Sequence, residues 1–314
     1  MTAVLNIPMT DKAGETILIA GPTASGKSWV ALALAEAIGG EIVNADALQV
    51  YRDLAVLSAR PGPAETARRP HHLFGFIDAA ERCSAGRWAR AAAETIAAIH
   101  ARGRPAVVVG GTGLYFRALE EGLSPMPEVD HAFRAEASAL YDALGGERFR
   151  AALLERDPTL ARIPPGDRQR LIRAHEVLAS AGAPLSAYQA APREPLIARA
   201  AARVVLEPKR DELYAAVEER LDGMIAAGAL EEARRLLDRG LDPDLPAMKA
   251  LGAAEFMAHL AGRSDLLTAI ALAKRNTRRF AKRQLTWFRN QTPDWPRAET
   301  KEAALALLVD GTAA

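Results

Sequence analysis

The most constraining feature of the chain is the octapeptide GPTASGKS at residues 21–28. It follows a run of β-branched and apolar residues at 16–20 and precedes a helical pattern that includes Val30, Leu32 and Leu34. Gly21 and Gly26 permit backbone shapes in which amide N–H groups converge on an oxyanion, and the helix adds its positive N-terminal end. The segment therefore predicts a phosphate-binding loop between a strand and a helix.

Two side chains of this loop predict its ligands. Lys27 supplies a point charge for phosphate and Ser28 a hydroxyl for Mg²⁺, as in ATP- and other nucleotide-binding proteins. We therefore expect Mg²⁺ as cofactor. The loop does not indicate whether the phosphate is transferred, hydrolysed or expelled as a leaving group.

Composition limits the class of protein. With 314 residues, 49% of them hydrophobic, the chain can bury a large core, which suggests two domains or one domain with an insertion. The formal net charge is +1, so a nucleic-acid partner must be held by local basic patches. Cys83 is the single cysteine, which excludes an internal disulfide, and the sequence shows neither a signal peptide nor an apolar run of membrane-spanning length. We expect a cytoplasmic protein without membrane contact.

Short strand-like runs alternate with helical patterns, which favours a parallel sheet covered on both faces. The strand-like runs are residues 17–20, 41–44, 106–109 and 203–206. The helical patterns are residues 28–38, 86–100, 211–227, 230–239, 247–260 and 264–288. We predict an α/β fold, a P-loop NTPase-like parallel sheet flanked by helices, with an inserted all-helical domain. The expected core comprises residues 1–124 and 199–314, and the expected insertion residues 125–198.

Asp46 lies just beyond the second predicted strand, in the segment NADALQVY. Ligands of open α/β sheets bind at the carboxyl ends of the strands, so this carboxylate is our candidate general base. A helix N-cap or a carboxylate in the Mg²⁺ shell is the alternative.

The strand at 106–109 ends in Gly110, Gly111, Thr112 and Gly113. A nucleotide hydrolase usually has an aspartate there to arrange metal and water. Glycines with a threonine hydroxyl suggest instead the close approach of a bulky substrate. A tight strand-to-helix turn is the alternative.

Two basic clusters point to a polyanionic partner. Between residues 274 and 291 there is no acidic residue, and a one-sign helical stripe favours a polyanion over a solvated face. Its members are Lys274, Arg275, Arg278, Arg279, Lys282, Arg283 and Arg289. On the opposite side we expect core anchors rather than base-stacking platforms, namely Phe280, Gln284, Trp287 and Phe288. A smaller cluster, either a nucleic-acid contact or a plain surface, contains Arg168, Gln169, Arg170 and Arg173.

Several stretches together resemble the tRNA dimethylallyltransferase family, also called tRNA isopentenyltransferases, over essentially the whole chain. They are GPTASGKS, NADALQVYRDL, HHLFGFID, VVVGGTGLYFRAL, RIPPGDRQRLIRAHEV, RLDGMIAAGALEE and AKRQLTWFR. The resemblance implies transfer of a dimethylallyl group from dimethylallyl diphosphate to N6 of the adenosine 3′ of the tRNA anticodon. It also implies that the helical insertion grips the anticodon stem-loop, and we expect a monomer.

The resemblance assigns roles to individual residues. The implied catalytic residues are Asp46, Thr112 and Arg220, the arginine neutralising the leaving diphosphate. The implied diphosphate cradle is Gly21, Thr23, Ala24, Ser25, Gly26, Lys27 and Ser28, with Mg²⁺ held through Ser28. The implied tRNA contacts are Asp46, Ala47, Leu48, Gln49, Gln169, Arg170, Arg173, Lys249, Arg278, Lys282, Arg283 and Gln284. The chain departs from the family in LSARP, where Arg60 replaces a lysine, and in NADALQ, which lacks a hydroxyl beside Asp46.

Two other functions use the same loop. A small-molecule kinase would transfer a γ-phosphoryl group, and an RNA-binding nucleotide switch would leave its RNA unmodified. The missing carboxylate after residues 106–109 argues against both, and the basic stripe argues against the kinase.

Overall fold

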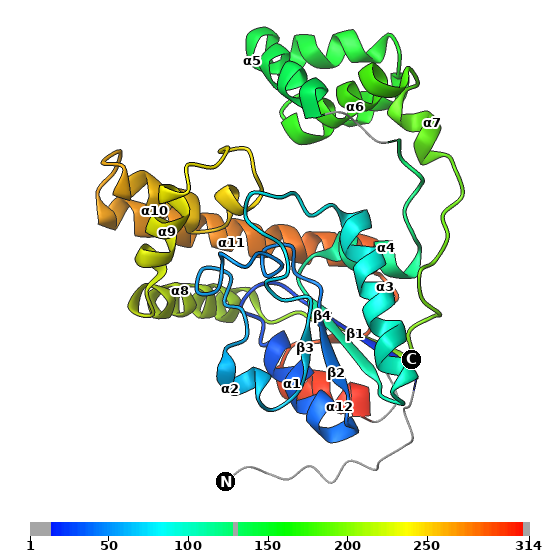
Figure 1. Cartoon of the computed structure of the whole chain (residues 1–314), viewed down its shortest axis with the longest axis vertical. Helices are drawn as coiled ribbons and strands as arrows, with labels where there is room; N and C mark the ends of the chain where they lie inside the picture. The colour runs from blue at the N-terminus through cyan, green and yellow to red at the C-terminus, as the bar shows by residue number, and fades with distance from the viewer. Residues whose placement is uncertain (1–13, 128–130, 310–314) are drawn as a thin grey trace. The chain divides into compact units, whose positions relative to one another are not determined.

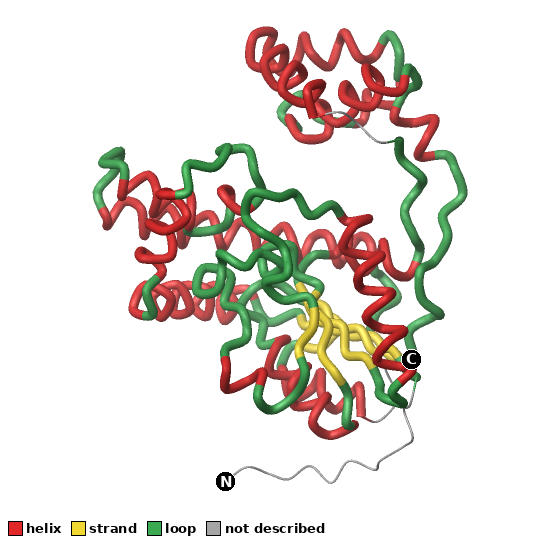
Figure 2. The backbone as a smooth tube through the Cα atoms, in the orientation of Figure 1, coloured by secondary structure: helices red, strands yellow, loops and turns green. Residues whose placement is uncertain are grey.

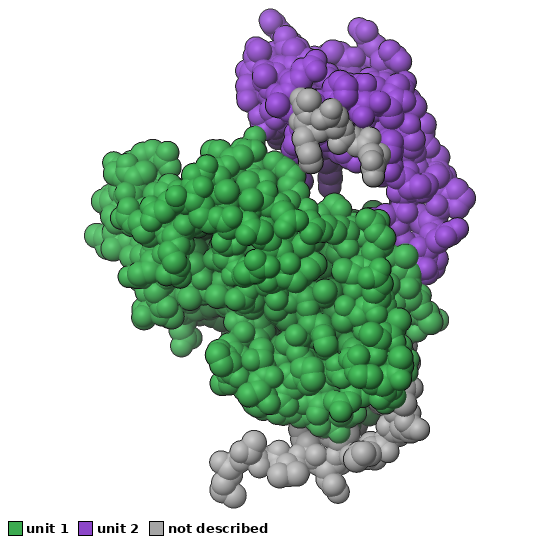
Figure 3. All heavy atoms as spheres, viewed as in Figure 1, with its two compact units in different colours: residues 1–120, 196–314 green, residues 121–195 purple. Residues whose placement is uncertain are grey.

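A computed structural model describes residues 14–127 and 131–309, and the chain divides into two compact units (Figure 3). Unit 1 is formed by Met1–Glu120 with Leu196–Ala314, and unit 2 by Glu121–Pro195. No helix within the described ranges is long and apolar enough to span a membrane.

Unit 1 contains a six-stranded sheet in which every pairing is parallel, in the order β3-β2-β4-β1-β5-β6 (Figures 1 and 2). The strands are β1 (Thr16–Ala20), β2 (Glu41–Asn44), β3 (His71–His72), β4 (Ala106–Gly110), β5 (Ala202–Leu206) and β6 (Arg297–Ala298). The predicted parallel α/β architecture is confirmed, and the four predicted strands are β1, β2, β4 and β5. The two-residue strands β3 and β6 were not predicted, because two residues carry no readable periodicity.

Helices cover both faces of this sheet. Those of unit 1 are α1 (Lys27–Ile38), α2 (Pro63–Thr66), α3 (Ala85–Ala101), α4 (Gly113–Glu120), α8 (Arg210–Ala226), α9 (Ala229–Asp238), α10 (Ala253–Leu260), α11 (Leu266–Gln291) and α12 (Lys301–Val309). On one face α1 and α12 share a core with Ile17 and Ile19 of β1, whereas α3 contacts β2 and β4 from the other face. The prediction of one continuous helix over residues 247–260 is wrong. Gly252 has φ 82°, and the segment splits into a 3₁₀ turn at Ala247–Lys249 and helix α10.

Unit 2 contains helices joined by loops and no strand among its described residues. Its elements are α5 (His131–Leu154), a 3₁₀ turn (Pro158–Arg162), α6 (Arg168–Ala181) and α7 (Leu185–Gln189). Phe149, Leu171 and Val177 are buried in a core of its own. A separate apolar core is what allows such a unit to form as a domain.

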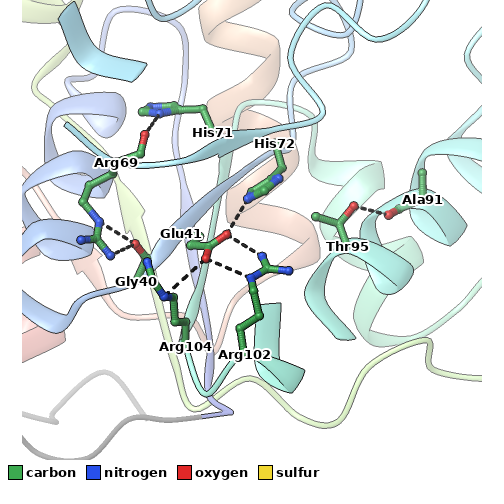
Figure 4. Close-up of polar contacts among 9 residues, drawn as sticks. All are labelled: Gly40, Glu41, Arg69, His71, His72, Ala91, Thr95, Arg102 and Arg104. Atoms are coloured by element: carbon green, nitrogen blue, oxygen red, sulfur yellow. Dashed lines mark hydrogen bonds and ion pairs between the residues drawn. The ribbon is translucent and has the colours of Figure 1, made fainter. Parts of the chain in front are cut away.

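A buried carboxylate ties together the edge of the sheet opposite the phosphate loop (Figure 4). Glu41, at the first residue of β2, accepts hydrogen bonds of 2.7 Å from both His72 and Arg102, and Arg104 lies 3.7 Å away. Burial by itself would raise the pKa of Glu41, but the bonds from Arg102 and His72 outweigh it and hold the pKa below 4.5. His72 thus has a structural role.

We expect Glu41→Gln to lower the free energy of unfolding by about 1–3 kcal/mol at pH 7, because charge-assisted hydrogen bonds are lost at a buried site. Since the folded pKa lies below the unfolded one, this stabilisation is present above pH 4.5 and disappears as the pH falls through the folded value. Urea unfolding at pH 7 and across the acid range measures both effects. Glu36→Gln, which breaks an exposed pair with Arg68, is the control and should change little. Equal losses in the two variants would contradict the role given to Glu41.

Candidate active site

The loop after β1 has the backbone shape of an anion cradle. Ala24 and Gly26 have φ values of 64° and 84°, and Gly26 directly precedes α1. A Cβ at Gly21 would lie 2.8 Å from the Ser25 Oγ and 3.1 Å from the Leu206 carbonyl oxygen, so this position requires glycine. The N-terminus of α1 and the turned backbone together direct amide groups toward one point.

The Ser25 hydroxyl gives independent evidence that this loop binds a phosphate. Its hydroxyl is buried and makes no hydrogen bond within the described part of the chain. An unsatisfied buried hydroxyl is costly, and a phosphate oxygen would satisfy it. The conformation of the loop thus fits a phosphorylated ligand.

Buried Lys27 and half-buried Arg220 place two cations beside one carboxylate. The pKa of Lys27 is lowered from 10.5 to about 8, mainly by burial. The negative charge of Asp46 opposes this lowering of the pKa, whereas the positive charge of Arg220 contributes to it. Burial likewise lowers the pKa of Arg220, again opposed by Asp46. The Lys27 ammonium donates to the Pro22 carbonyl oxygen at 3.1 Å, and Arg220 donates to that of Ser58 at 3.2 Å. With two cations and one anion, this centre retains an excess of positive charge suited to a polyanionic ligand.

A pocket joins Asp46 and Arg220 to an apolar wall. Its polar lining consists of Thr23, Asp46, Ser58, Arg220 and Thr277. Its apolar lining consists of Leu48, Leu57, Val217, Leu221, Met224, Leu251 and Phe280. This combination of charged and apolar lining suits a ligand with a charged end and a small hydrocarbon end.

Asp46 lies at the carboxyl end of β2 and lines this pocket. Its Oδ1 accepts the Leu48 N–H at 2.9 Å, and its own N–H donates to Asn44 Oδ1 at 2.9 Å. Residues 47–50 form turns, so Asp46 does not cap a helix. One carboxylate oxygen is thus held by the loop, and no hydrogen bond from the described residues reaches the other.

The glycines after β4 accommodate the protein itself. A Cβ at Gly110 would lie 2.0 Å from the Ala45 carbonyl oxygen, one at Gly111 2.3 Å from Gln284 Nε2, and one at Gly113 2.0 Å from the ring of Trp287. The expectation that these glycines admit a bulky substrate is therefore wrong. The close approaches are made by the β2 loop and by α11, which are remote in sequence.

Thr112, expected in the channel, uses its hydroxyl within the loop. Its Oγ1 accepts the Ala47 N–H at 2.9 Å, and its own N–H donates to the Ala45 carbonyl oxygen at 3.2 Å. It is not among the residues that line the pocket. Thr112 therefore holds the Asp46 loop against β4.

The basic stripe of α11 is partly neutralised by residues from elsewhere. Lys274 pairs with Asp222 at 2.7 Å, Arg278 pairs with Glu218, and Arg289 pairs with Glu207 at 2.5 Å. The exposed cations of α11 without an ion pair to any described residue are Arg275, Arg279, Lys282 and Arg283. Three of these, with Thr286, line a shallow open groove: Arg279, Lys282 and Arg283. This groove, rather than the whole stripe, is the candidate polyanion surface of unit 1.

Gln284, expected both as a core anchor and as an implied tRNA contact, is buried within unit 1, as the first of these expectations predicts. Its Oε1 accepts the Thr23 N–H at 2.9 Å, and its Nε2 donates to the Gly111 carbonyl oxygen at 2.8 Å. Both polar atoms of its amide are therefore used inside the protein. As expected of core anchors, Phe288 is fully buried, whereas Phe280 lines the pocket.

The remaining expected tRNA residues lie at several places. Gln49 donates to the Ser58 and Ala59 carbonyl oxygens at 3.0 Å each, and Lys249 pairs with Asp244 at 2.6 Å. In unit 2, exposed Gln169 and Arg170 lie in the first turn of α6, where Arg170 pairs with Asp167 at 3.4 Å. Arg173 pairs with buried Glu176 at 3.4 Å. Gln169 is therefore free for a ligand, whereas Arg170 and Arg173 hold acidic neighbours.

Glu232 is a residue of the site that the sequence reasoning missed. Its buried carboxylate accepts the N–H groups of Ala55, Val56 and Leu57 at 2.9, 2.9 and 2.8 Å, and so fixes one wall of the pocket. The sequence feature that could have identified Glu232 is its position as an acidic residue on the apolar face of α9, with Ala229, Ala233 and Leu236. An acid on such a face requires buried donors.

We expect Ser25→Ala to leave the free energy of unfolding unchanged or to raise it, because the hydroxyl has no partner to lose. The affinity for inorganic pyrophosphate should fall by about tenfold, which corresponds to one hydrogen bond to a charged group. Urea unfolding and calorimetry measure the two quantities. Ser58→Ala removes a buried hydroxyl that donates to the Leu54 carbonyl oxygen, and should cost about 1 kcal/mol of stability. Unchanged pyrophosphate affinity in Ser25→Ala would argue against a phosphate at Ser25.

Comparison with family models matches this chain to two descriptions. The model "IPP transferase" matches residues 49–291, and the model "Isopentenyl transferase" matches residues 14–71. Together they include the phosphate loop, Asp46, Arg220 and α11.

Curated relatives and solved structures agree with the family models. A tRNA dimethylallyltransferase of Phenylobacterium zucineum is 58% identical over 89% of this chain and 91% of its own length. That of Caulobacter sp. strain K31 is 52% identical over 91% and 93%. The crystal structure of a tRNA isopentenylpyrophosphate transferase from Bacillus halodurans is similar with a TM-score of 0.69 at 32% identity, covering 96% of each chain. A eukaryotic dimethylallyltransferase acting on tRNA has a TM-score of 0.70 at 26% identity, covering 87% of this chain and 70% of its own.

Proposed function

Because the chain belongs to the IPP transferase family, we propose that it transfers a dimethylallyl group from dimethylallyl diphosphate to N6 of the adenosine 3′ of the anticodon in tRNA, releasing diphosphate. The observation that carries the proposal is the pocket in which Asp46 and Arg220 meet an apolar wall beside the phosphate loop. A short prenyl chain attached to a diphosphate matches both halves of the pocket.

The loop and its cations would stabilise the leaving group. Diphosphate departs when its growing negative charge is neutralised, and Lys27, Arg220 and the loop amides are positioned to do this. Their burial strengthens these interactions, because the local dielectric is low. Binding of a diphosphate would also favour the charged form of Lys27, whose pKa burial lowers to about 8.

Magnesium fits this site as a companion of the diphosphate. Ser28 is exposed at the start of α1, and the described residues include no group of three His, Cys, Asp or Glu side chains that could hold an ion without a ligand. Mg²⁺ commonly binds through one or two protein oxygens together with substrate phosphates. We assign the protein oxygen to Ser28. When bound, the ion would supply further neutralisation of the leaving diphosphate.

Asp46 would act on the incoming amine. The exocyclic N6 of adenine is a weak nucleophile because its lone pair is delocalised into the ring. As the N6–C1 bond forms and the C1–O bond to diphosphate breaks, N6 loses a proton, which the free oxygen of Asp46 accepts. The diphosphate keeps the electron pair of the broken bond.

The adenosine must leave its stack to reach the pocket, at a cost of a few kcal/mol that is smallest in a single-stranded anticodon loop. The groove formed by Arg279, Lys282 and Arg283 offers free cations to the tRNA backbone. Unit 2, with exposed Gln169, is assigned to the anticodon stem-loop. We propose that the enzyme acts as a monomer and, since its substrate is tRNA, in the cytoplasm.

One assay tests this function against the kinase and the nucleotide switch. Unmodified tRNA is incubated with the enzyme, dimethylallyl diphosphate and Mg²⁺ in the absence of ATP. We expect the tRNA to gain the mass of one prenyl unit. A requirement for ATP, or binding of tRNA without modification, would favour one of the alternatives.

We expect Asp46→Ala to lower kcat by about 10²- to 10⁴-fold, because the base that accepts the N6 proton is lost. The affinity for tRNA should remain nearly unchanged. Single-turnover kinetics and equilibrium tRNA binding measure the two effects. Asp46→Asn is the matched variant, since its side-chain oxygen still accepts the Leu48 N–H; it should be as slow as Asp46→Ala if the carboxylate is the base. An active Asp46→Asn enzyme would contradict that role.

We expect joint replacement of Lys282 and Arg283 by alanine to weaken tRNA binding and to reduce its log–log salt slope by about 1–2, because each free cation neutralises about one phosphate. The control replaces Lys274 and Arg289, which carry the same charge but are held by Asp222 and Glu207. It should alter the slope much less. Equal slopes for the two double variants would show that the groove is not the tRNA surface.

A further inference from the structure

Gln284 joins two loops of the active site through one side chain. Its amide accepts from the Thr23 backbone in the phosphate loop and donates to the Gly111 backbone after β4, while its side chain is 6% exposed. The Gly111 position leaves no room for a Cβ, which would lie 2.3 Å from the Gln284 nitrogen. The glycine and the glutamine therefore form one fitted contact.

The contact continues toward Asp46. Gly111 is covalently joined to Thr112, whose hydroxyl receives the Ala47 N–H at 2.9 Å. The next residue, Leu48, donates its N–H to the Asp46 carboxylate at 2.9 Å. A continuous path of peptide and hydrogen bonds thus runs from the phosphate loop through Gln284 to the carboxylate.

The proposed transfer makes the length of this path important. The reacting carbon must lie between a diphosphate on the loop and an amine beside Asp46, so the separation of the two loops sets the geometry of the reaction. Displacement of a catalytic group by about 1 Å can cost about 100-fold in rate. The phosphate loop follows β1 and the Asp46 loop follows β2. The turn after β4 lies between these two loops, because β4 lies between β1 and β2 in the sheet.

We propose that Gln284 is a positioning residue that fixes the phosphate loop relative to Asp46, and that it does not bind tRNA. This inference rests on the proposed function. A glutamine suits the position because one amide both accepts and donates, whereas a carboxylate cannot donate to the Gly111 carbonyl oxygen. Trp287 extends the same contact, since its ring lies against Gly113.

The proposal separates Gln284 from its neighbours on α11. Lys282 and Arg283 are exposed and line the basic groove, whereas Gln284 points into the protein. A helix of this length presents different residues to solvent and to the core within one turn. Sequence proximity to the cations therefore does not make Gln284 part of the tRNA surface.

Kinetics, binding and hydrogen exchange of Gln284→Ala and Gln284→Glu test the proposal, with Asn290→Ala as the matched amide variant. Asn290 is exposed on the same helix and makes no side-chain hydrogen bond with the described residues. We expect both Gln284 variants to lower kcat at saturating substrates by about 10- to 100-fold. The tRNA affinity of both Gln284 variants should change by less than about twofold, which is the size of effect expected of a surface substitution. Asn290→Ala should change neither kcat nor tRNA affinity.

Two readouts do not depend on turnover. Deuterium uptake of peptides covering residues 21–28 and 110–113 should rise in Gln284→Ala, because the Thr23 N–H loses its acceptor. The affinity for inorganic pyrophosphate should fall by about tenfold as the cradle loosens.

Weakened tRNA binding with unchanged kcat would overturn the proposal and make Gln284 a tRNA contact. Unchanged exchange in both peptides would also overturn it. If the wild-type protein does not prenylate tRNA, the proposed function fails, but exchange and pyrophosphate binding still test the connection between the loops.

Discussion

Parallel pairing of β1 with β4 on one side and β5 on the other is the constraint from which the active site follows. In a parallel sheet the carboxyl ends of all strands meet at one edge, so the loops after β1, β2 and β4 are neighbours although they begin at residues 21, 45 and 111. The register pairs Ala20 with Gly110, which places the phosphate loop directly beside the glycine turn. The edge at which β2 begins is held instead by the buried Glu41 and its cationic partners.

The second determinant is the imbalance of buried charge in the pocket. Lys27 and Arg220 face Asp46, and burial lowers the pKa of both cations. Such a centre is costly without a polyanion and becomes favourable when one binds. Both cations are held by backbone carbonyl oxygens, Lys27 by that of Pro22 and Arg220 by that of Ser58.

Much of the fold and of the site could be predicted from the sequence. The phosphate loop, the position of Asp46 after β2 and the strands β1, β2, β4 and β5 are encoded locally, by glycine placement, strand-like runs and their order. Errors arose where a partner came from a distant segment. The acids that neutralise α11 lie on α8 and at Glu207, and two of the glycines, Gly111 and Gly113, accommodate Gln284 and Trp287, which lie more than 170 positions away.

The sequence by itself determined the type of loop, the parallel α/β class and the chemical identity of the charged groups, since each depends on residues that are adjacent or in helical or strand spacing. The tertiary structure alone decided which cations of α11 remain free, which backbone groups Gln284 joins, and that apolar side chains of α8, α11 and the loops form a wall of the pocket. Those features depend on the register between segments that meet only when the sheet is assembled. Burial and pairing are properties of that assembly, and no local pattern specifies them.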